Sequence, residues 1–146
     1  MKNTAVFVGS FDPFTVGHHD ILRRALPLFD RIVVGVGVNE HKQCMYSAKE
    51  RVERIAALYA DEPKVVVEQY CELTVDFARR HEAGFIVKGV RSMKDFEYER
   101  EQADVNRQIS GIDTLLLIAS PALASVSSSV VRELLHYGKD VSAFLP

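Results

Sequence analysis

Three short segments of this chain combine glycines, hydroxyls and cations in ways that suit the binding of phosphate groups. The first is GSFDPFTVGH, residues 9–18, which lies between an apolar run and a helical pattern. Gly9 lets the backbone turn sharply or approach a ligand closely, and Ser10 adds a hydroxyl. His18 falls in the first helical turn, where free amides and the helix dipole favour an anion, and it can donate a hydrogen bond to a phosphoryl oxygen. Taken alone, this composition more often indicates an ordinary Gly-Pro loop with a histidine cap.

The second segment is KGVR, residues 88–91, which directly follows another apolar run. Two cations around a glycine can clamp phosphates, and the guanidinium of Arg91 adds a planar fork of donors. The same cations could equally be solvated and paired with Asp95 or Glu97. Both interpretations stay open, because the end of a buried strand is where ligands of parallel sheets bind.

The third segment is SVSSS, residues 125–129, which leads directly into a helical pattern. One serine suffices to cap a helix. Ser127, Ser128 and Ser129 together supply hydroxyls and free amides that suit the outer phosphates of a nucleotide. A flexible loop is the alternative, and the direct junction with a helix argues against it. Lys42 follows a different apolar run and could reach the same end of a sheet, although most lone lysines are only solvated.

Several other binding motifs are absent from the sequence. No Gly-x-x-x-x-Gly-Lys-[Ser/Thr] stretch occurs, and the glycines at positions 35 and 37 lack the third glycine of a dinucleotide fingerprint. The histidines at positions 19, 41, 81 and 136 show no metal-ligand spacing, and Cys44 and Cys71 lack the paired spacing of a zinc site. We therefore expect neither a P-loop nor a dedicated protein metal site.

Apolar runs alternate with helical patterns along the chain, which predicts an α/β fold with a five-stranded parallel sheet and helices on both faces. Ser47 and Glu50 form a candidate capping box, Thr74 a candidate helix cap, and Gly138 a candidate helix end. The predicted strands cover residues 5–8, 32–38, 65–67, 85–87 and 115–119, and the clearest predicted helices cover residues 17–29, 47–59 and 95–109.

Length and composition favour one globular domain, residues 1–146, with a packed core. Apolar residues make up 47% of the chain and charged residues 26%. The net charge of −2 argues against nucleic-acid binding, which usually needs a basic face. No apolar run approaches the roughly 18 residues of a membrane span, and the apolar start is too short for a signal peptide. The expected location is the cytoplasm.

The three segments together resemble a known family. GSFDPFTVGH resembles the [His/Thr]-x-Gly-His motif of the nucleotidylyltransferase superfamily. The further stretches KGVR, DFEYE at residues 95–99, NR at 106–107, VSSS at 126–129 and the closing GKDVSAFLP resemble the bacterial phosphopantetheine adenylyltransferase family. The first motif identifies only the superfamily, whereas the full set in this order is specific and spans the chain. The resemblance implies a Rossmann-like nucleotidylyltransferase fold.

It also implies an activity: transfer of an adenylyl group from ATP to 4′-phosphopantetheine, which gives dephospho-coenzyme A and pyrophosphate in coenzyme A synthesis. In such enzymes the acceptor's phosphate attacks the α-phosphorus in line, without a covalent enzyme intermediate, so positioning and charge stabilisation carry the catalysis. Magnesium would accompany the triphosphate. The family is commonly hexameric, so a homo-oligomer is expected.

The resemblance assigns residues to three roles. His18, Lys42 and Ser10 would be catalytic, with His18 stabilising the transition state. Ser10, Lys42, Thr74 and Lys88 would bind the acceptor. The expected ATP-binding set is Ser10, Phe11, His18, Gly89, Val90, Arg91, Glu99, Ala124, Ser125, Val126, Ser127, Ser128, Ser129 and Val130.

Two positions depart from the family's pattern, and two other functions compete. Position 10 is more often threonine, and position 88 is commonly arginine, whose bidentate fork Lys88 lacks. A nucleotidylyltransferase for nicotinamide mononucleotide or glycerol phosphate is the competing enzyme. A non-catalytic nucleotide sensor on the same fold is the other alternative, and it should have lost His18 or Lys42, which are both present.

Overall fold

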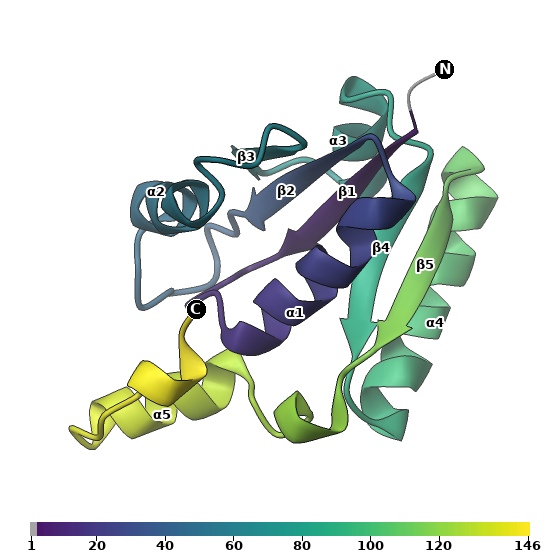
Figure 1. The fold of residues 1–146 in the computed structure, drawn as a ribbon. Helices are drawn as coiled ribbons and strands as arrows, with labels where there is room; N and C mark the ends of the chain where they lie inside the picture. The colour runs from purple at the N-terminus through teal and green to yellow at the C-terminus, as the bar shows by residue number, and fades with distance from the viewer. Residues whose placement is uncertain (1–2) are drawn as a thin grey trace.

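Five parallel strands form the centre of the computed structural model, which describes residues 3–146 (Figure 1). The strand order is β3-β2-β1-β4-β5. The chain therefore adds β2 and β3 on one side of β1, and then β4 and β5 on the other side. This confirms the predicted α/β fold with a five-stranded parallel sheet. The strands are β1 Thr4–Gly9, β2 Arg31–Gly37, β3 Val65–Tyr70, β4 Phe85–Val90 and β5 Asp113–Ile118.

Helices cover both faces of the sheet, as the long apolar runs of the central strands require. On one face, residues of α1 and α2 such as Leu22 and Ile55 pack with Phe7 and Val34. On the other face, Phe77 of α3 packs with alternate residues of the same strands. The helices are α1 Val16–Ala25, α2 Ala48–Leu58, α3 Thr74–Arg80, α4 Met93–Ser110 and α5 Ser128–His136, with short 3-10 turns at Leu26–Leu28, Pro121–Leu123 and Ser142–Phe144.

The strand order decides where a ligand can bind. Chain segments leave β1 and β4, which are neighbours, toward opposite sides of the sheet, and this opens a crevice beyond their carboxyl ends. Figure 1 shows α5 beyond the arrowheads of the strands. The segments that follow β1, β4 and β5 are the three phosphate-binding candidates.

Of three predicted helix ends, one is confirmed, one is confirmed in part and one is wrong. Gly138 adopts φ +71° after α5, as expected of a helix terminator. Ser47 accepts a hydrogen bond from the backbone N–H of Glu50, but the Glu50 carboxylate bonds the Ser47 hydroxyl, so the capping box is incomplete. The first helix, predicted to reach residue 29, ends at Ala25 because Pro27 lacks an N–H and the chain continues as a 3-10 turn.

Thr74 is not a helix cap. The N-cap of α3 is Leu73, which makes no side-chain capping bond, and Thr74 is the first helical residue. Its hydroxyl instead lies 3.1 Å from the hydroxyl of Tyr70 at the end of β3. The side chain therefore contacts the end of β3 and does not cap the helix. Among the helices of residues 3–146, none has the length and apolarity needed to cross a membrane.

Candidate active site

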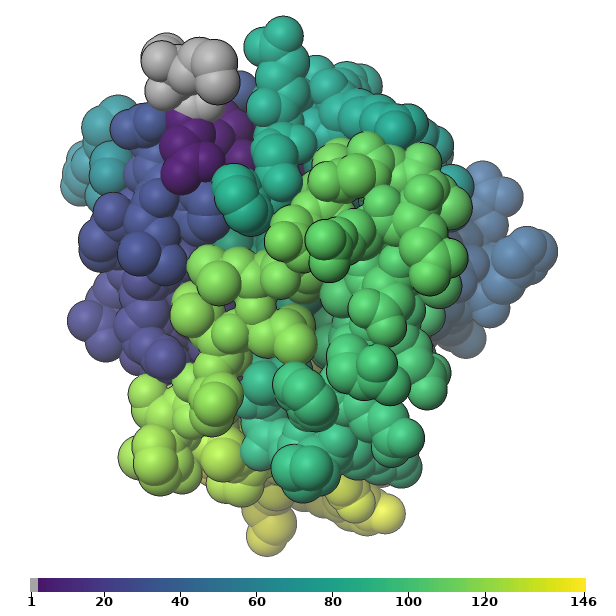
Figure 2. Space-filling view, turned by 90° about the vertical axis from the view of Figure 1, so that its right-hand side faces the viewer, coloured from purple at the N-terminus to yellow at the C-terminus, as the bar shows by residue number. Residues whose placement is uncertain are grey.

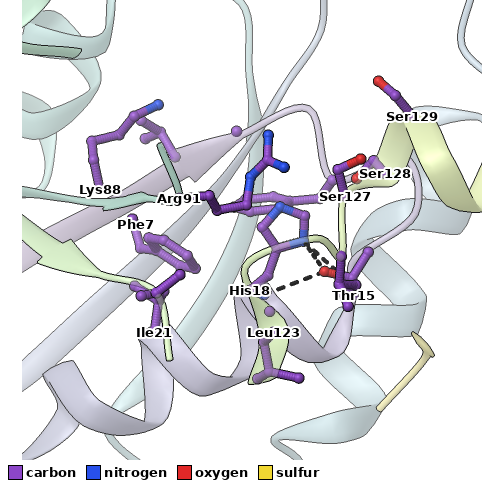
Figure 3. A pocket seen from close by; sticks show the side chains of 17 residues that line it. Phe7, Thr15, His18, Ile21, Lys88, Arg91, Leu123, Ser127, Ser128 and Ser129 are labelled. Carbon is purple, nitrogen blue, oxygen red and sulfur yellow. Dashed lines mark hydrogen bonds between the residues drawn. The ribbon is translucent and has the colours of Figure 1, made fainter. Parts of the chain in front are cut away.

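A cavity of about 280 Å³ lies beyond the carboxyl ends of β1 and β4 (Figure 3). Residues from all three candidate segments line it, because parallel strands end at the same edge of the sheet. Apolar side chains such as Ile21 and Leu123 form part of its wall. Its polar lining residues are Thr15, His18, Lys88, Arg91, Ser127, Ser128 and Ser129, and Gly9, Gly17 and Gly89 contribute backbone.

Thr15 and His18 form a reciprocal capping box at the start of α1. The Thr15 hydroxyl accepts a hydrogen bond from the His18 backbone N–H at 3.4 Å, and His18 Nδ1 accepts one from the Thr15 backbone N–H at 2.9 Å. Since a backbone N–H can only donate, Nδ1 of the neutral ring carries no proton and Nε2 carries it. The dashed lines of Figure 3 mark these contacts. The histidine thus presents an N–H donor to the cavity.

His18 is held in its neutral form. Burial lowers the pKa of His18 from 6.5 to about 4, and the cations Arg91 and Lys88 add to this effect. In Figure 3 the guanidinium of Arg91 lies close to the His18 ring. Aromatic rings hold the imidazole on its other sides, since Phe14 stacks on it with centroids 5.4 Å apart and Phe11 meets it edge-on at 5.0 Å.

Neither cation of the second segment is freely solvated. Lys88 Nζ lies 3.2 Å from a carboxylate oxygen of Glu99 on α4, and Arg91 Nε lies 3.3 Å from a carboxylate oxygen of Asp95. The Arg91–Asp95 pair agrees in part with the alternative interpretation, in which these cations are surface charges paired with Asp95 or Glu97. Both residues nevertheless line the cavity, so each pairs with a carboxylate on α4 and remains within reach of an anion.

The serines of the third segment make different contacts. Ser127 is the N-cap of α5 and accepts a hydrogen bond from the backbone N–H of Val130. Ser128 donates its hydroxyl proton to the carbonyl of Pro13 at 2.7 Å, which ties α5 to the first segment. Ser129 accepts from Arg132 at 3.2 Å. All three serines line the cavity, and so does Val126.

Other residues expected in the ATP site do not contribute to the wall of this cavity. Val90 is buried in β4, and Ala124, Ser125 and Val130 lie next to lining residues. Ser10 and Lys42 lie at the edge of the crevice, where Lys42 Nζ donates to the Ser10 hydroxyl at 3.2 Å. The structure thus brings Lys42 to the first segment from 32 residues away along the chain.

A second cavity of about 180 Å³ adjoins the first one and shares Val8, Gly9 and Lys88 with it. Thr74 lines this second cavity from α3, and Glu99 lines it from α4. Glu99, which the resemblance assigns to the ATP site, lies beside Lys88 and lines the second cavity. The remaining residues of this wall are Tyr70, Ile86, Tyr98, Gln102, Ala103, Asn106 and Thr114.

Residues that sequence reasoning left without a role also build the site. Thr15 lies just before the predicted helix and could have been found as a candidate N-cap, although His18 does not match the Glu or Gln of the usual capping-box pattern. Asp12 and Arg51 are buried and contact the segments around Ser10 and Lys42. No local sequence pattern predicts this role for either residue. Within residues 3–146, no three His, Cys, Asp or Glu side chains gather in a way that could hold a metal ion.

Comparison with known proteins places this geometry in a family. Residues 6–134 match the cytidylyltransferase-like family. The phosphopantetheine adenylyltransferase of Phocaeicola vulgatus is 53% identical over 97% of this chain and 94% of its own. The phosphopantetheine adenylyltransferases of Bacteroides fragilis and Porphyromonas gingivalis (strain W83) are 51% and 52% identical, over 97% and 99% of this chain and 95% of their own.

Solved structures support the fold independently of sequence. A bifunctional NMN adenylyltransferase/ADP ribose pyrophosphatase from Francisella tularensis superposes with a TM-score of 0.74 at 17% identity. The match covers 99% of this chain, which spans 45% of that longer protein. At this identity the match supports the architecture alone. The sequence relatives, in contrast, are 53% and 51% identical to this chain over 97% of its length. The chain belongs to the phosphopantetheine adenylyltransferase family.

Proposed function

We propose that this protein transfers the adenylyl group of ATP to 4′-phosphopantetheine, producing dephospho-coenzyme A and pyrophosphate for coenzyme A synthesis. The observation that carries this proposal is the pair of adjoining cavities that share Gly9 and Lys88. One cavity offers the hydroxyls and amides of a helix start beside a histidine donor, and the other extends toward Thr74. Two substrates bound in them would meet beside Lys88.

ATP is assigned to the first cavity. Its triphosphate would lie against the N-terminus of α5, where Ser127, Ser128 and Ser129 and the free amides of the first turn face the cavity. Arg91 supplies a cation in the same cavity, and Figure 3 shows its guanidinium near the His18 ring. In this arrangement the α-phosphate lies nearest to His18.

The acceptor is assigned to the second cavity, with its phosphate at Lys88 and its arm toward Thr74. A phosphate oxygen of the acceptor attacks the α-phosphorus of ATP, and the bond from that phosphorus to the bridging oxygen of the β-phosphate breaks, so that pyrophosphate leaves. No covalent bond to the protein forms. We assign the Glu99 carboxylate the role of holding Lys88 at this junction, since the two groups lie 3.2 Å apart.

The chain's own groups act by placing charge and donors around the reacting phosphorus. The His18 ring donates from Nε2–H to a non-bridging oxygen of the α-phosphate, because Nδ1 is occupied by the Thr15 N–H. Lys42 and Ser10, already in contact at 3.2 Å, bind the reacting phosphates from the other side. Their combined effect is greatest in the transition state, where negative charge spreads over these oxygens.

Magnesium is proposed to enter with ATP. We propose that the ion is held mainly by triphosphate oxygens and water, as is usual for Mg²⁺ bound together with a nucleotide. When bound, the ion would neutralise part of the triphosphate charge and help pyrophosphate to leave. No side chain is assigned to it.

The remaining proposals concern organisation. We propose that residues 1–146 act as one nucleotidylyltransferase domain and that the protein works in the cytoplasm. We also propose that it forms a homo-oligomer, specifically a hexamer, as the resemblance to the family implies. The exposed surface of α4 supports assembly: this 18-residue helix has no buried residue, and Val105 and Ile109 are each 53% exposed. Figure 2 faces the edge of the molecule where α4 and β5 lie. Sedimentation analysis would measure the subunit number.

The decisive experiment measures pyrophosphate release from ATP with a panel of acceptors. We expect 4′-phosphopantetheine to support turnover, with dephospho-coenzyme A identified by mass spectrometry. Nicotinamide mononucleotide and glycerol phosphate should give only background. Turnover with either of them alone would replace the proposed acceptor, and ATP binding without turnover on any acceptor would favour a nucleotide sensor.

A further inference from the structure

The segment that carries Lys42 has no regular secondary structure to hold it in place. It covers the residues between the end of β2 at Gly37 and the start of α2 at Ala48. Lys42 is exposed, and its ammonium lies 3.2 Å from the Ser10 hydroxyl at the edge of the crevice. A long lysine on an irregular segment loses conformational entropy when it is held in one geometry. Something else in the fold must therefore restrict this segment if Lys42 is to act at a defined position.

The buried carboxylate of Asp12 holds the far end of the segment. One oxygen accepts a hydrogen bond from the backbone N–H of Met45 at 2.7 Å, and the other accepts from that of Tyr46 at 2.9 Å. Asp12 is only 2% exposed and forms no ion pair among the described residues. Two backbone donors thus stabilise its charge, and these charge-assisted bonds join two loops that are more than thirty residues apart in the sequence.

The buried guanidinium of Arg51 holds the same region from the other side. It is 4% exposed, and it donates to three backbone carbonyls: Ser10 at 2.6 Å, Gly37 at 3.2 Å and Tyr46 at 3.1 Å. These carbonyls lie beside the phosphate-binding hydroxyl, at the start of the Lys42 segment and at its end. The planar fork of arginine can reach all three at once, which the single ammonium of lysine cannot do.

We infer that Asp12 and Arg51 are positioning residues, which together clamp the Lys42 segment onto the loop of Ser10 so that Lys42 is placed for the reacting phosphates before substrate binds. The inference rests on the proposed function, because it gives Lys42 its role. The physical reason for two buried charges is precision. Asp12, which belongs to the Ser10 loop, bonds backbone N–H groups of the Lys42 segment, and Arg51 bonds backbone carbonyls of both loops, whereas apolar packing would leave the loops free to slide. The clamp thus lowers the cost of ordering Lys42 in the transition state.

The test is a double-mutant cycle on turnover. Asp12→Asn keeps the size of the side chain but replaces one acceptor oxygen with an amide that opposes a backbone N–H. We expect kcat for dephospho-coenzyme A formation to fall about ten- to a hundredfold, as for loss of a charge-assisted bond. In a Lys42→Ala background the same change should lower kcat less than about twofold, because no lysine remains to be placed. Arg51→Lys should behave in the same way.

A matched control uses Asp30, whose carboxylate also accepts a backbone N–H, that of Asn3 at 2.7 Å, at the opposite end of the strands. Asp30→Asn should leave kcat unchanged in both backgrounds. Hydrogen exchange gives a second measurement: the amides of Met45 and Tyr46 should exchange faster in Asp12→Asn while those of β1 and β2 keep their protection. This readout remains available if turnover is low.

Different outcomes would overturn different claims. If the parent protein makes no dephospho-coenzyme A, the proposed function fails. If the parent is active but Asp12→Asn lowers kcat equally with and without Lys42, the residue supports the fold generally and the positioning role is wrong. Unchanged kcat together with unchanged exchange at Met45 and Tyr46 would also remove the clamp.

Discussion

Acid should destabilise the folded protein through His18, and the size of this effect follows from its surroundings. The pKa of His18 is lowered from 6.5 to about 4 by burial and by Arg91 and Lys88. Between these two values the unfolded chain binds a proton that the folded chain does not. Folding stability therefore falls as the pH falls from about 6.5 toward 4, and the stabilising contribution of the neutral ring is complete above 6.5.

The magnitude can be worked out from the two pKa values. Going from pH 7 to pH 5, protonation of the unfolded chain at this one site lowers the free energy of unfolding by about 2 kcal/mol. Other groups titrate over the same range, so the measured quantity is the difference between the parent protein and His18→Gln, which has no titrating side chain. We expect the variant to lose about 2 kcal/mol less stability than the parent between the two pH values.

Urea denaturation at pH 7 and pH 5, followed by circular dichroism, measures this difference. The matched control is His41→Gln, which removes an exposed histidine and leaves the buried imidazole in place. It should retain the acid sensitivity of the parent. An equal loss of stability in the parent and in His18→Gln would refute the conclusion that His18 is held neutral, and with it the assignment of the ring as an Nε2–H donor.

Three further predictions test the site and the core. His18→Ala should lower turnover by about two to three orders of magnitude with little change in the dissociation constant of ATP, as measured by calorimetry; near-normal turnover would remove its role. Lys88→Ala should weaken 4′-phosphopantetheine about ten- to a hundredfold and ATP much less, and equal losses for both would move Lys88 away from the acceptor. Gly35→Ala should lower the free energy of unfolding by about 1–3 kcal/mol in a urea titration, because its Cβ would lie 2.6 Å from the Phe77 ring. An unchanged unfolding midpoint would contradict this close packing.

Much of the fold was predictable because it depends on local pattern. Runs such as residues 32–38 are almost wholly β-branched or glycine, and this identifies strands buried on both faces. Alternation of such runs with helical patterns predicts a parallel sheet. The errors fell at the ends of elements: Pro27 ended α1 early, and Thr74 turned out to be the first helical residue of α3. Only small differences in free energy decide where a helix or strand ends, so tertiary contacts can outweigh the local sequence preference there.

The candidate phosphate-binding segments were also visible in the sequence, since glycines, hydroxyls and cations at strand ends are local features. That they face one cavity follows from the parallel sheet. Their detailed chemistry needed the tertiary structure. The pairing of Lys88 with Glu99 depends on how α4 packs beside β4, and the placement of Lys42 over Ser10 depends on the course of the loop after β2.

The sequence by itself thus determined the class of fold and the candidate phosphate-binding segments, because periodicity and glycine placement act through neighbouring residues. Only the tertiary structure decided which charges are buried and what they hold. Asp12 bonds Met45 and Tyr46, and Arg51 bonds the Ser10 carbonyl 41 residues away. Such bonds depend on strand order and loop path, which arise from the packing of the whole chain and leave no periodic pattern in the residues that form them.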